Sequence, residues 1–202
     1  MVESGRSTDL FSRARAMIAH PAQEWPAIAA EPSSTGSILQ GYVFPLAIIA
    51  PVFQVAGALI FEHKPPAYAC AEAVVLFLLE LASLFVVAFI ADAFVNTFGG
   101  TKDSAASFKW IAYASTARWV AGIFAVIPFF GWLIVLVGSL YSLYALALGT
   151  VPMMRLSPAR AGGFATVVVL GYLVVLLASE ICLRFFLSML FPGVEIIPGG
   201  GR

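Results

Sequence analysis

Apolar residues fill five long stretches of this chain, and short polar segments separate them. The stretches run over residues 42–61, 69–98, 108–127, 129–151 and 163–191. Each is long enough, at about 20 residues or more, for an α-helix to cross a hydrocarbon core. Because lipid offers no partner for backbone N–H and C=O groups, helices are the expected form of such segments. The pattern therefore predicts an all-α polytopic membrane protein, with residues 42–191 forming a five-helix transmembrane bundle.

A second hydrophobic pattern, with helical spacing, lies in the predicted N-terminal segment, residues 1–41. Apolar residues recur every three or four positions, with two arginines elsewhere on the helical wheel (Leu10, Phe11, Ala14, Met17 and Ile18; Arg13 and Arg15). This spacing predicts a short amphipathic helix. Such a helix fits the headgroup plane of a membrane. Packing against the protein's own cytoplasmic face is an equally good interpretation.

The dipeptide His20-Pro21 predicts the end of that helix and the first turn of another, because proline is disfavoured after a helical residue but suits a helix start. Trp25 follows, and we interpret Trp25 and Phe11 as interfacial anchors. After the last apolar stretch, residues 192–202 are rich in glycine and are expected to be a flexible tail.

Composition supports a membrane environment. The chain has 202 residues, of which 61% are apolar and 11% are charged, and a mean hydropathy of +0.96. Soluble domains contain about 25% charged residues. The formal net charge is zero, which gives no reason to expect a nucleic acid as partner. Membrane lipids are the expected surroundings.

The distribution of lysine and arginine predicts the orientation of the chain. One set of predicted loops contains seven of these residues (Arg6, Arg13, Arg15, Lys102, Lys109, Arg155 and Arg160), and the other contains two (Lys64 and Arg202). Basic loops stay in the cytoplasm. The expected topology is an N-terminus in the cytoplasm and a C-terminus outside, in a bacterial inner (plasma) membrane. Arg155 and Arg160 are then expected to face anionic lipid headgroups.

Ionisable residues inside apolar stretches are candidates for function. Counting ~1.5 Å per residue from inner helix ends at Phe98 and Phe108, Asp92 lies about 9 Å deep and Arg118 about 15 Å deep. The gap is within the reach of an arginine, so we predict an intramembrane pair between Asp92 and Arg118. Two interpretations stay open: a buried pair that holds helices together, and a polar path or binding pocket.

Three further charges are expected near the outer interface, where long side chains reach the headgroups. They are Glu80, Glu180 and Arg184. Glu180 and Arg184 are four residues apart, so they can pair on one helix face. Pro51 lies in the middle of the first predicted span and is expected to kink it.

No pattern points to catalysis, a metal or a cofactor. The chain contains no HExxH, CxxC, Walker or GxSxG motif. Its two cysteines, Cys70 and Cys182, lie in or beside apolar stretches, and we interpret them as small membrane-buried side chains. We therefore expect a protein that is not an enzyme.

Several segments, taken in order, resemble one known family. They are PAQEWPAIAAE at residues 21–31, FGGTKDSAASFKWIAYAST at 98–116, IPFFGWL at 127–133, YSLYALALGTVPMM at 141–154 and LSPARA at 156–161. Together they resemble the Yip1 domain family in its bacterial form. The resemblance implies a cytoplasmic N-terminus and five spans. It also implies a role in membrane trafficking, since eukaryotic relatives bind Rab-type GTPases.

Two hypotheses for function follow. The first is a non-enzymatic scaffold or partner-binding factor in membrane organisation or trafficking, which meets a protein partner at the cytoplasmic face. The second is a small-molecule, ion or lipid transporter or channel subunit with a polar site at Asp92 and Arg118. Assembly into a homo-oligomer is left open by the sequence.

Overall fold

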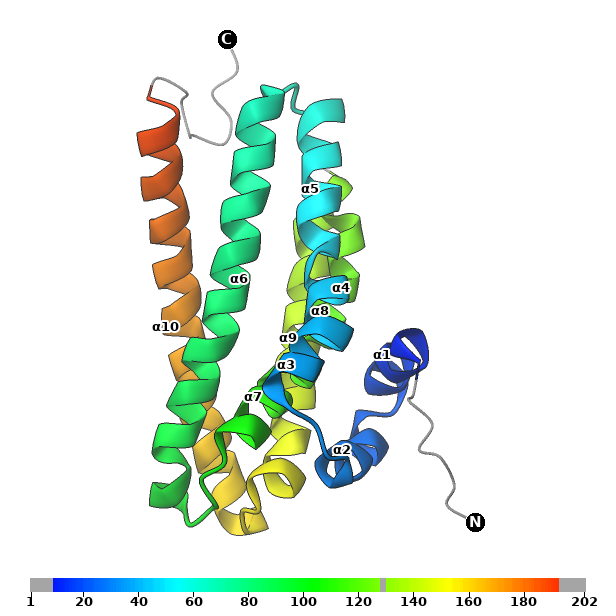
Figure 1. Ribbon diagram of the computed structural model, residues 1–202, viewed down its shortest axis with the longest axis vertical. Coiled ribbons are helices and arrows are strands. Elements are labelled where there is room, and N and C mark those ends of the chain that lie inside the picture. Colours follow the sequence, from blue (N-terminus) through cyan, green and yellow to red (C-terminus); the bar gives the residue numbers. More distant parts are fainter. Residues whose placement is uncertain (1–8, 128–129, 193–202) are drawn as a thin grey trace.

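The computed structural model describes residues 9–127 and 130–192, and all the regular structure in these ranges is helical (Figure 1). The helices, in order, are α1 (Leu10–Ala19), α2 (Pro21–Ala30), α3 (Thr35–Ile38), the π-helical turn η1 (Leu39–Val43), α4 (Phe44–Ala47), α5 (Ile49–Ile60), α6 (Pro66–Phe94), the 3₁₀ turn η2 (Val95–Phe98), α7 (Ser104–Ala114), α8 (Thr116–Ala121), the 3₁₀ turn η3 (Gly122–Val126), α9 (Gly131–Met154) and α10 (Pro158–Leu190). The flexible tail predicted for 192–202 lies, beyond residue 192, outside the described ranges.

Four helical stretches in the described ranges are long and apolar enough to cross a membrane. They are Thr35–Ile60, Pro66–Phe98, Gly131–Met154 and Pro158–Leu190, with 24 to 33 residues each. At ~1.5 Å per residue the shortest measures about 36 Å, which exceeds a hydrocarbon core of about 30 Å. They lie side by side along the long axis of the molecule (Figure 1).

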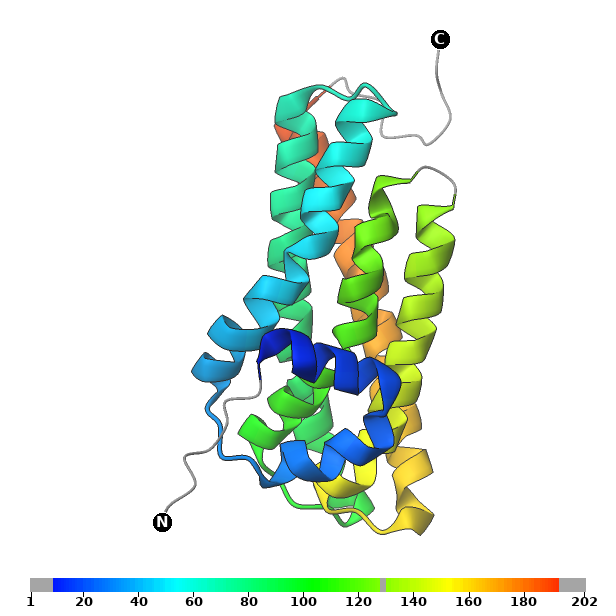
Figure 2. The same ribbon diagram turned by 90° about the vertical axis from the view of Figure 1, so that its right-hand side faces the viewer.

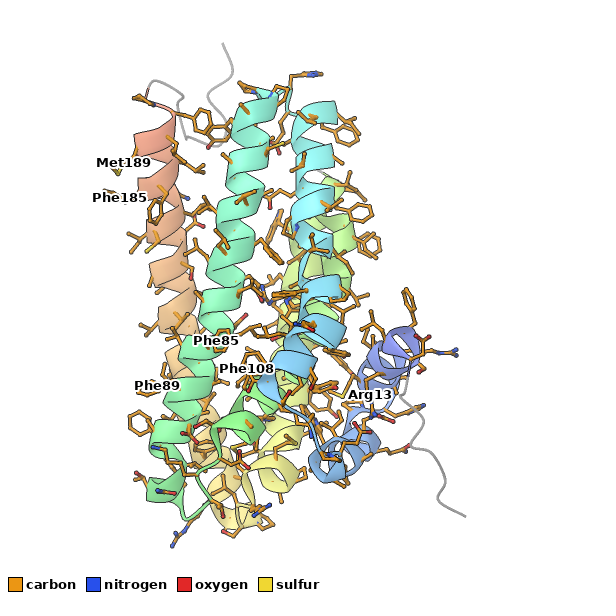
Figure 3. All side chains as sticks on the ribbon, viewed as in Figure 1. Arg13, Phe85, Phe89, Phe108, Phe185 and Met189 are labelled. Atoms are coloured by element: carbon orange, nitrogen blue, oxygen red, sulfur yellow. The ribbon has the colours of Figure 1, made fainter. Side chains whose placement is uncertain are left out.

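The outer surface of these helices is apolar, as lipid contact requires. The side chains of Phe185 and Met189 on α10 point away from the bundle, and both are exposed (Figure 3). Phe89 on α6 is 72% exposed. Large exposed apolar areas are rare on monomeric soluble proteins. Lipid is therefore the solvent that fits this surface.

The first of the four stretches is not a continuous α-helix. It begins at Thr35, passes through the π-helical turn η1, and is interrupted at Ile48, so that α3 and α4 lean away from α5 (Figure 2). Pro51 cannot donate a hydrogen bond to the carbonyl of Ala47, one turn earlier. The interruption thus falls in the turn before Pro51, where the sequence predicts a kink.

The third predicted span, residues 108–127, is divided into α7, α8 and η3, so the described ranges contain four long apolar stretches where five were predicted. The break at Ser115 has a local cause. The Oγ atom of Ser115 donates to the carbonyl of Ile111 at 2.9 Å, and the Oγ1 atom of Thr116 donates to that of Tyr113 at 2.6 Å. Hydroxyls that bond the preceding turn bend or weaken helices.

The helices α1 and α2 form an arm that crosses the lower half of the bundle in Figure 2. α1 packs on α8 and α2 packs on α9. Met17, Trp25 and Ile28 are almost completely buried in this contact. Of the two interpretations of the first helix, packing on the protein's own surface is the one present in the structure. Phe11 remains 76% exposed on the opposite side.

Candidate functional site

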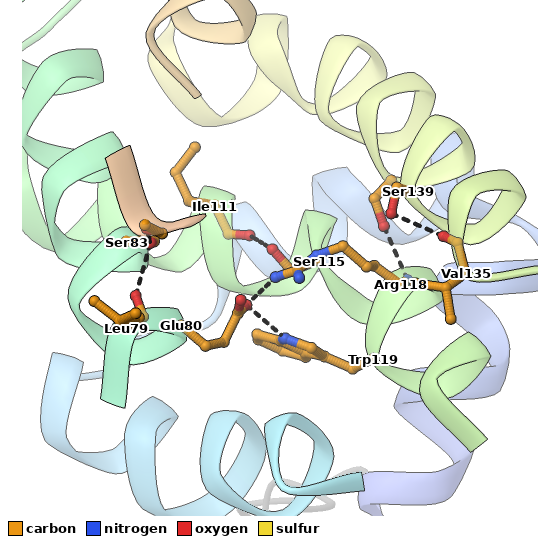
Figure 4. Close-up of polar contacts among 11 residues, drawn as sticks. Leu79, Glu80, Ser83, Ile111, Ser115, Arg118, Trp119, Val135 and Ser139 are labelled. Carbon is orange, nitrogen blue, oxygen red and sulfur yellow. Dashed lines mark hydrogen bonds and ion pairs between the residues drawn. The ribbon is translucent and has the colours of Figure 1, made fainter. Parts of the chain in front are cut away.

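Arg118 of α8 forms an ion pair with Glu80 of α6 in the interior of the bundle (Figure 4). The Nη2 atom of Arg118 donates to Oε1 of Glu80, and the Nε1 atom of Trp119 donates to the same oxygen at 2.9 Å. The exposed fractions of the Arg118 and Glu80 side chains are 19% and 15%. The predicted pair between Asp92 and Arg118 is therefore wrong, because Glu80 takes the place assigned to Asp92.

The start of α7 explains the error. The predicted depth of Arg118 counts from Phe108, but α7 begins at Ser104, where the side chain of Asp103 accepts a hydrogen bond from the N–H of Ala106 at 3.0 Å. Arg118 lies fourteen residues after Ser104, and Glu80 lies fourteen residues before Phe94, the last residue of α6. Counted along α6 for Glu80 and along α7 and α8 for Arg118, both residues therefore lie about 21 Å from the end of the bundle where α6 meets α7.

Other polar groups surround the ion pair. The N–H of Arg118 donates to the Oγ atom of Ser142 on α9 at 3.1 Å. The hydroxyls of Ser83 on α6 and Ser179 on α10 lie 3.1 Å apart. Within the described ranges the Nε atom of Arg118 is buried without a hydrogen-bond partner. These contacts form a polar layer across α6, α8, α9 and α10, which we call the Glu80–Arg118 layer.

Asp92 lies at one end of the bundle instead, where it connects the end of α6 to the start of α7. Its Oδ2 atom accepts a hydrogen bond from Ser104 Oγ at 2.8 Å and lies 3.8 Å from Lys102 Nζ. Its Oδ1 atom is buried without a partner in the described part of the chain. The contacts indicate that Asp92 fixes the connection between α6 and α7.

A buried arginine that the sequence analysis placed on the polar side of the first helix holds the arm together. Arg13 Nη1 donates to Glu24 Oε2 at 2.8 Å, and Nη2 donates to Glu31 Oε1. Burial opposes the charge of Arg13, but the hydrogen bond and charge of Glu31 raise the pKa of this guanidinium above its ordinary value. The position of Arg13 four residues before Met17, on the buried face of α1, was the available signal.

Trp25 is completely buried, so its predicted role as an interfacial anchor is wrong. Its Nε1 atom donates to the carbonyl of Ala145 at 2.8 Å, and Trp110 Nε1 donates to the next carbonyl, Leu146, at 2.9 Å. Both indoles reach α9 over Gly149, where an added Cβ would lie 2.6 Å from Trp25 and 2.7 Å from Trp110. The missing side chain of Gly149 allows this packing.

The remaining predicted site residues lie near the ends of α9 and α10. Arg184 Nε donates to Glu180 Oε1 at 2.7 Å, as the spacing of four residues predicts, and both side chains are more than half exposed. Arg155 and Arg160 are exposed where α9 is followed by α10. Arg160 Nη1 lies 3.5 Å from the carbonyl oxygen of Phe98.

The described residues contain no group of three or more histidine, cysteine, aspartate or glutamate side chains that could hold a metal ion. Cys70 and Cys182 are free thiols, and both are exposed on the apolar outer surface.

Comparison with known proteins agrees with this architecture. The model of the Yip1 domain family matches residues 15–179, which include the arm from Arg15 onward and most of the bundle. A search of the curated proteins and a search of the solved structures each found no match. The family match covers most of the chain, so the protein belongs to the Yip1 domain family. Together with the four long apolar helices, it identifies a multi-pass membrane protein.

Proposed function

We propose that this Yip1 family member is a non-enzymatic scaffold, or partner-binding factor, in membrane organisation or trafficking, and that it binds its protein partner through the arm. The observation that supports this best is the way the arm is fixed. Trp25 fixes α2 against α9, and the Arg13 ion pairs tie α1 to α2 and to the residue after it. The helix α1 still exposes Phe11 and Arg15. An exposed aromatic ring beside a cation on a rigid helix suits protein recognition.

The proposal includes five membrane crossings, with α7, α8 and η3 together as the third, and an N-terminus in the cytoplasm of a bacterial cell. The distribution of charge supports it. Arg15, Lys102, Arg155 and Arg160 lie in the arm or at the end of the bundle where α6 meets α7, whereas Lys64 lies between α5 and α6 at the other end. The positive-inside rule places the first group in the cytoplasm. There Arg155 and Arg160 contact anionic headgroups. When no protein partner is bound, Phe11 contacts the membrane interface.

The test is to purify the full-length chain from its native host and identify by mass spectrometry the proteins that remain bound. Deleting the arm would be a poor test, because it would remove Trp25 from the core. The double variant Phe11→Ser, Arg15→Ser changes only exposed side chains. We expect it to lose a partner that Arg184→Gln, a change at the other end of the bundle, retains. The same set of partners in both variants would contradict the arm as the binding surface.

A transporter or channel subunit is the second candidate, and the Glu80–Arg118 layer is the observation that favours it. Charges within the membrane mark ion and substrate pathways. Because Glu80 is the partner of Arg118, the variants to compare are Glu80→Gln and Glu80→Gln, Arg118→Met, reconstituted in vesicles. A change in ion or solute flux at normal protein levels would support transport. Unchanged flux in the double variant would indicate that the Glu80–Arg118 ion pair only holds helices together.

A further inference from the structure

A cavity of about 220 Å³ lies where the arm meets the end of the bundle. Three segments far apart in the sequence line it: the end of α2 and the following loop, the start of α7 with the linker before it, and the end of α9. The charged lining residues are Glu31, Asp103, Lys109 and Arg155. The volume is below the roughly 300–1,000 Å³ of pockets for drug-sized ligands, so the cavity suits a headgroup or another small polar group.

Lys109 is the unusual residue in the lining. It is 6% exposed, and its Nζ atom donates to the backbone carbonyl of Glu31 at 2.5 Å. Among the described residues no carboxylate forms an ion pair with Lys109. Buried ammonium groups are ordinarily paired with a negative charge, because leaving one unpaired is costly. The ammonium group still has donors for an anion in the cavity.

Arg155 is the second cation of the lining, and its backbone is in an uncommon conformation. Its φ angle is 54°, the left-handed region that favours glycine. The turn is fixed by the N–H of Thr101, which donates to the carbonyl of Met154 at 3.3 Å. The guanidinium of Arg155 has no ion pair or hydrogen bond within the described ranges. Strained backbone of this kind is concentrated at functional sites.

The two carboxylates of the lining already have partners. Glu31 pairs with Arg13, and the Asp103 side chain caps α7 by accepting from the N–H of Ala106. The lining also carries the hydroxyls of Ser33 and Thr101. The cavity therefore presents two cations that form no ion pair within the described ranges, together with two residues that carry neutral hydroxyl groups.

We propose that this cavity binds a phosphate group, carried by a membrane lipid or by a soluble phosphate ester, with Lys109 and Arg155 as its charged ligands. A phosphate offers several acceptor oxygens, and cations form strong charge-assisted hydrogen bonds with them. The apolar lining residues Ala29, Pro32 and Pro152 leave room for the ester carbon atoms. A phosphate bound inside the cavity differs from the contact of exposed arginines with the membrane surface. The proposed site also does not depend on the scaffold role.

Binding can be measured by native mass spectrometry of the full-length protein in detergent. Dioleoyl phosphatidylglycerol is added in one series and glycerol 3-phosphate in the other. The test variants are Lys109→Gln and Arg155→Gln. The matched controls are Lys102→Gln, a 60% exposed lysine next to Thr101 that does not itself line the cavity, and Arg15→Gln on the arm.

We expect each cavity variant to bind about tenfold more weakly or worse, because each loses a hydrogen bond to a charged group, and each control to stay within about twofold. Binding of phosphatidylglycerol without binding of glycerol 3-phosphate identifies a lipid site, and binding of both identifies a site for phosphate esters in general. Both results support the proposal. Arg155→Gln decides the test if Lys109→Gln does not fold, because Arg155 is exposed at a helix end. Wild-type affinity in Arg155→Gln, or an equal loss in Lys102→Gln, would overturn the proposal.

Discussion

Breaking the Glu80–Arg118 ion pair from one side tests the polar layer most directly. Arg118→Met removes the charge and keeps much of the volume of the side chain. Glu80 then keeps one neutral hydrogen bond, from Trp119 Nε1 at 2.9 Å, for a carboxylate that is only 15% exposed. Two opposite charges about 4 Å apart attract by ~4 kcal/mol at an effective dielectric constant of 20. Removing one partner of such a buried pair costs about 3–5 kcal/mol.

The double variant Glu80→Gln, Arg118→Met distinguishes the loss of the pair from a loss of packing. A glutamine at position 80 can still accept the hydrogen bond from Trp119, so no buried charge and no orphaned indole N–H remain. We expect the free energy of unfolding of this variant to lie within about 1 kcal/mol of the wild-type value. The double variant should therefore be more stable than either single variant. That rescue is the direct sign of a compensated pair.

The free energy of unfolding is measurable by titration with sodium dodecyl sulfate in mixed micelles, with helix content followed by circular dichroism. Arg184→Met is the control, since Arg184 and Glu180 are more than half exposed and pair within one helix; its expected effect is below about 0.5 kcal/mol. The reasoning is refuted if Arg118→Met costs no more than this control, or if the double variant is as unstable as the sum of the single ones.

Three further variants test the packing of the arm, and the same unfolding titration applies to the first two. Gly149→Ala places a methyl group 2.6 Å from Trp25 and should cost about 1–3 kcal/mol of stability. The control Gly162→Ala in α10 meets nothing within 4 Å and should stabilise the protein by up to ~1 kcal/mol. Similar effects of both changes would be inconsistent with tight indole packing. Trp25→Ala should cost about 3–5 kcal/mol, whereas Phe11→Ala, which is 76% exposed, should leave stability unchanged. Arg13→Gln should speed amide hydrogen exchange in α1 and α2 relative to α10, because the arm loses its pairs with Glu24 and Glu31. Unchanged exchange would show that the other contacts of the arm, such as the hydrogen bond from Trp25 to α9, are sufficient to hold it.

The long helices could be predicted because burial in lipid needs only composition and length. The apolar runs around α6, α9 and α10 were readable without knowledge of neighbours. The start of α7 was missed because the polar residues before Phe108 resemble a loop. Asp103 was the available signal, since aspartate followed by small residues is typical of a helix N-cap. That displacement of four residues was enough to assign Arg118 the wrong partner.

The arm could not be predicted in the same way, because its contacts depend on how separate helices fold against one another, over 11 to 120 positions of sequence. The sequence predicts an interfacial anchor at Trp25, because it does not show that α9 offers the carbonyl of Ala145 as a hydrogen-bond acceptor and has no side chain at Gly149. Arg13 reads as a solvent-facing cation until Glu24 and Glu31 are folded back against it. Propensity and periodicity contain neither fact, since both arise from tertiary packing.

The balance of charge separates two kinds of polar site in this protein. In the Glu80–Arg118 layer the two charges neutralise each other, which is the arrangement that holds helices together at least cost in a membrane. In the cavity beside the arm, Lys109 and Arg155 lack such a partner among the described residues, while the carboxylates nearby are already bound. A structural pair is complete without a ligand, whereas the buried ammonium of Lys109, which has no ion pair in the described ranges, is not. We therefore expect ligand-dependent behaviour to follow substitutions at Lys109 and Arg155, and stability to follow substitutions at Glu80 and Arg118.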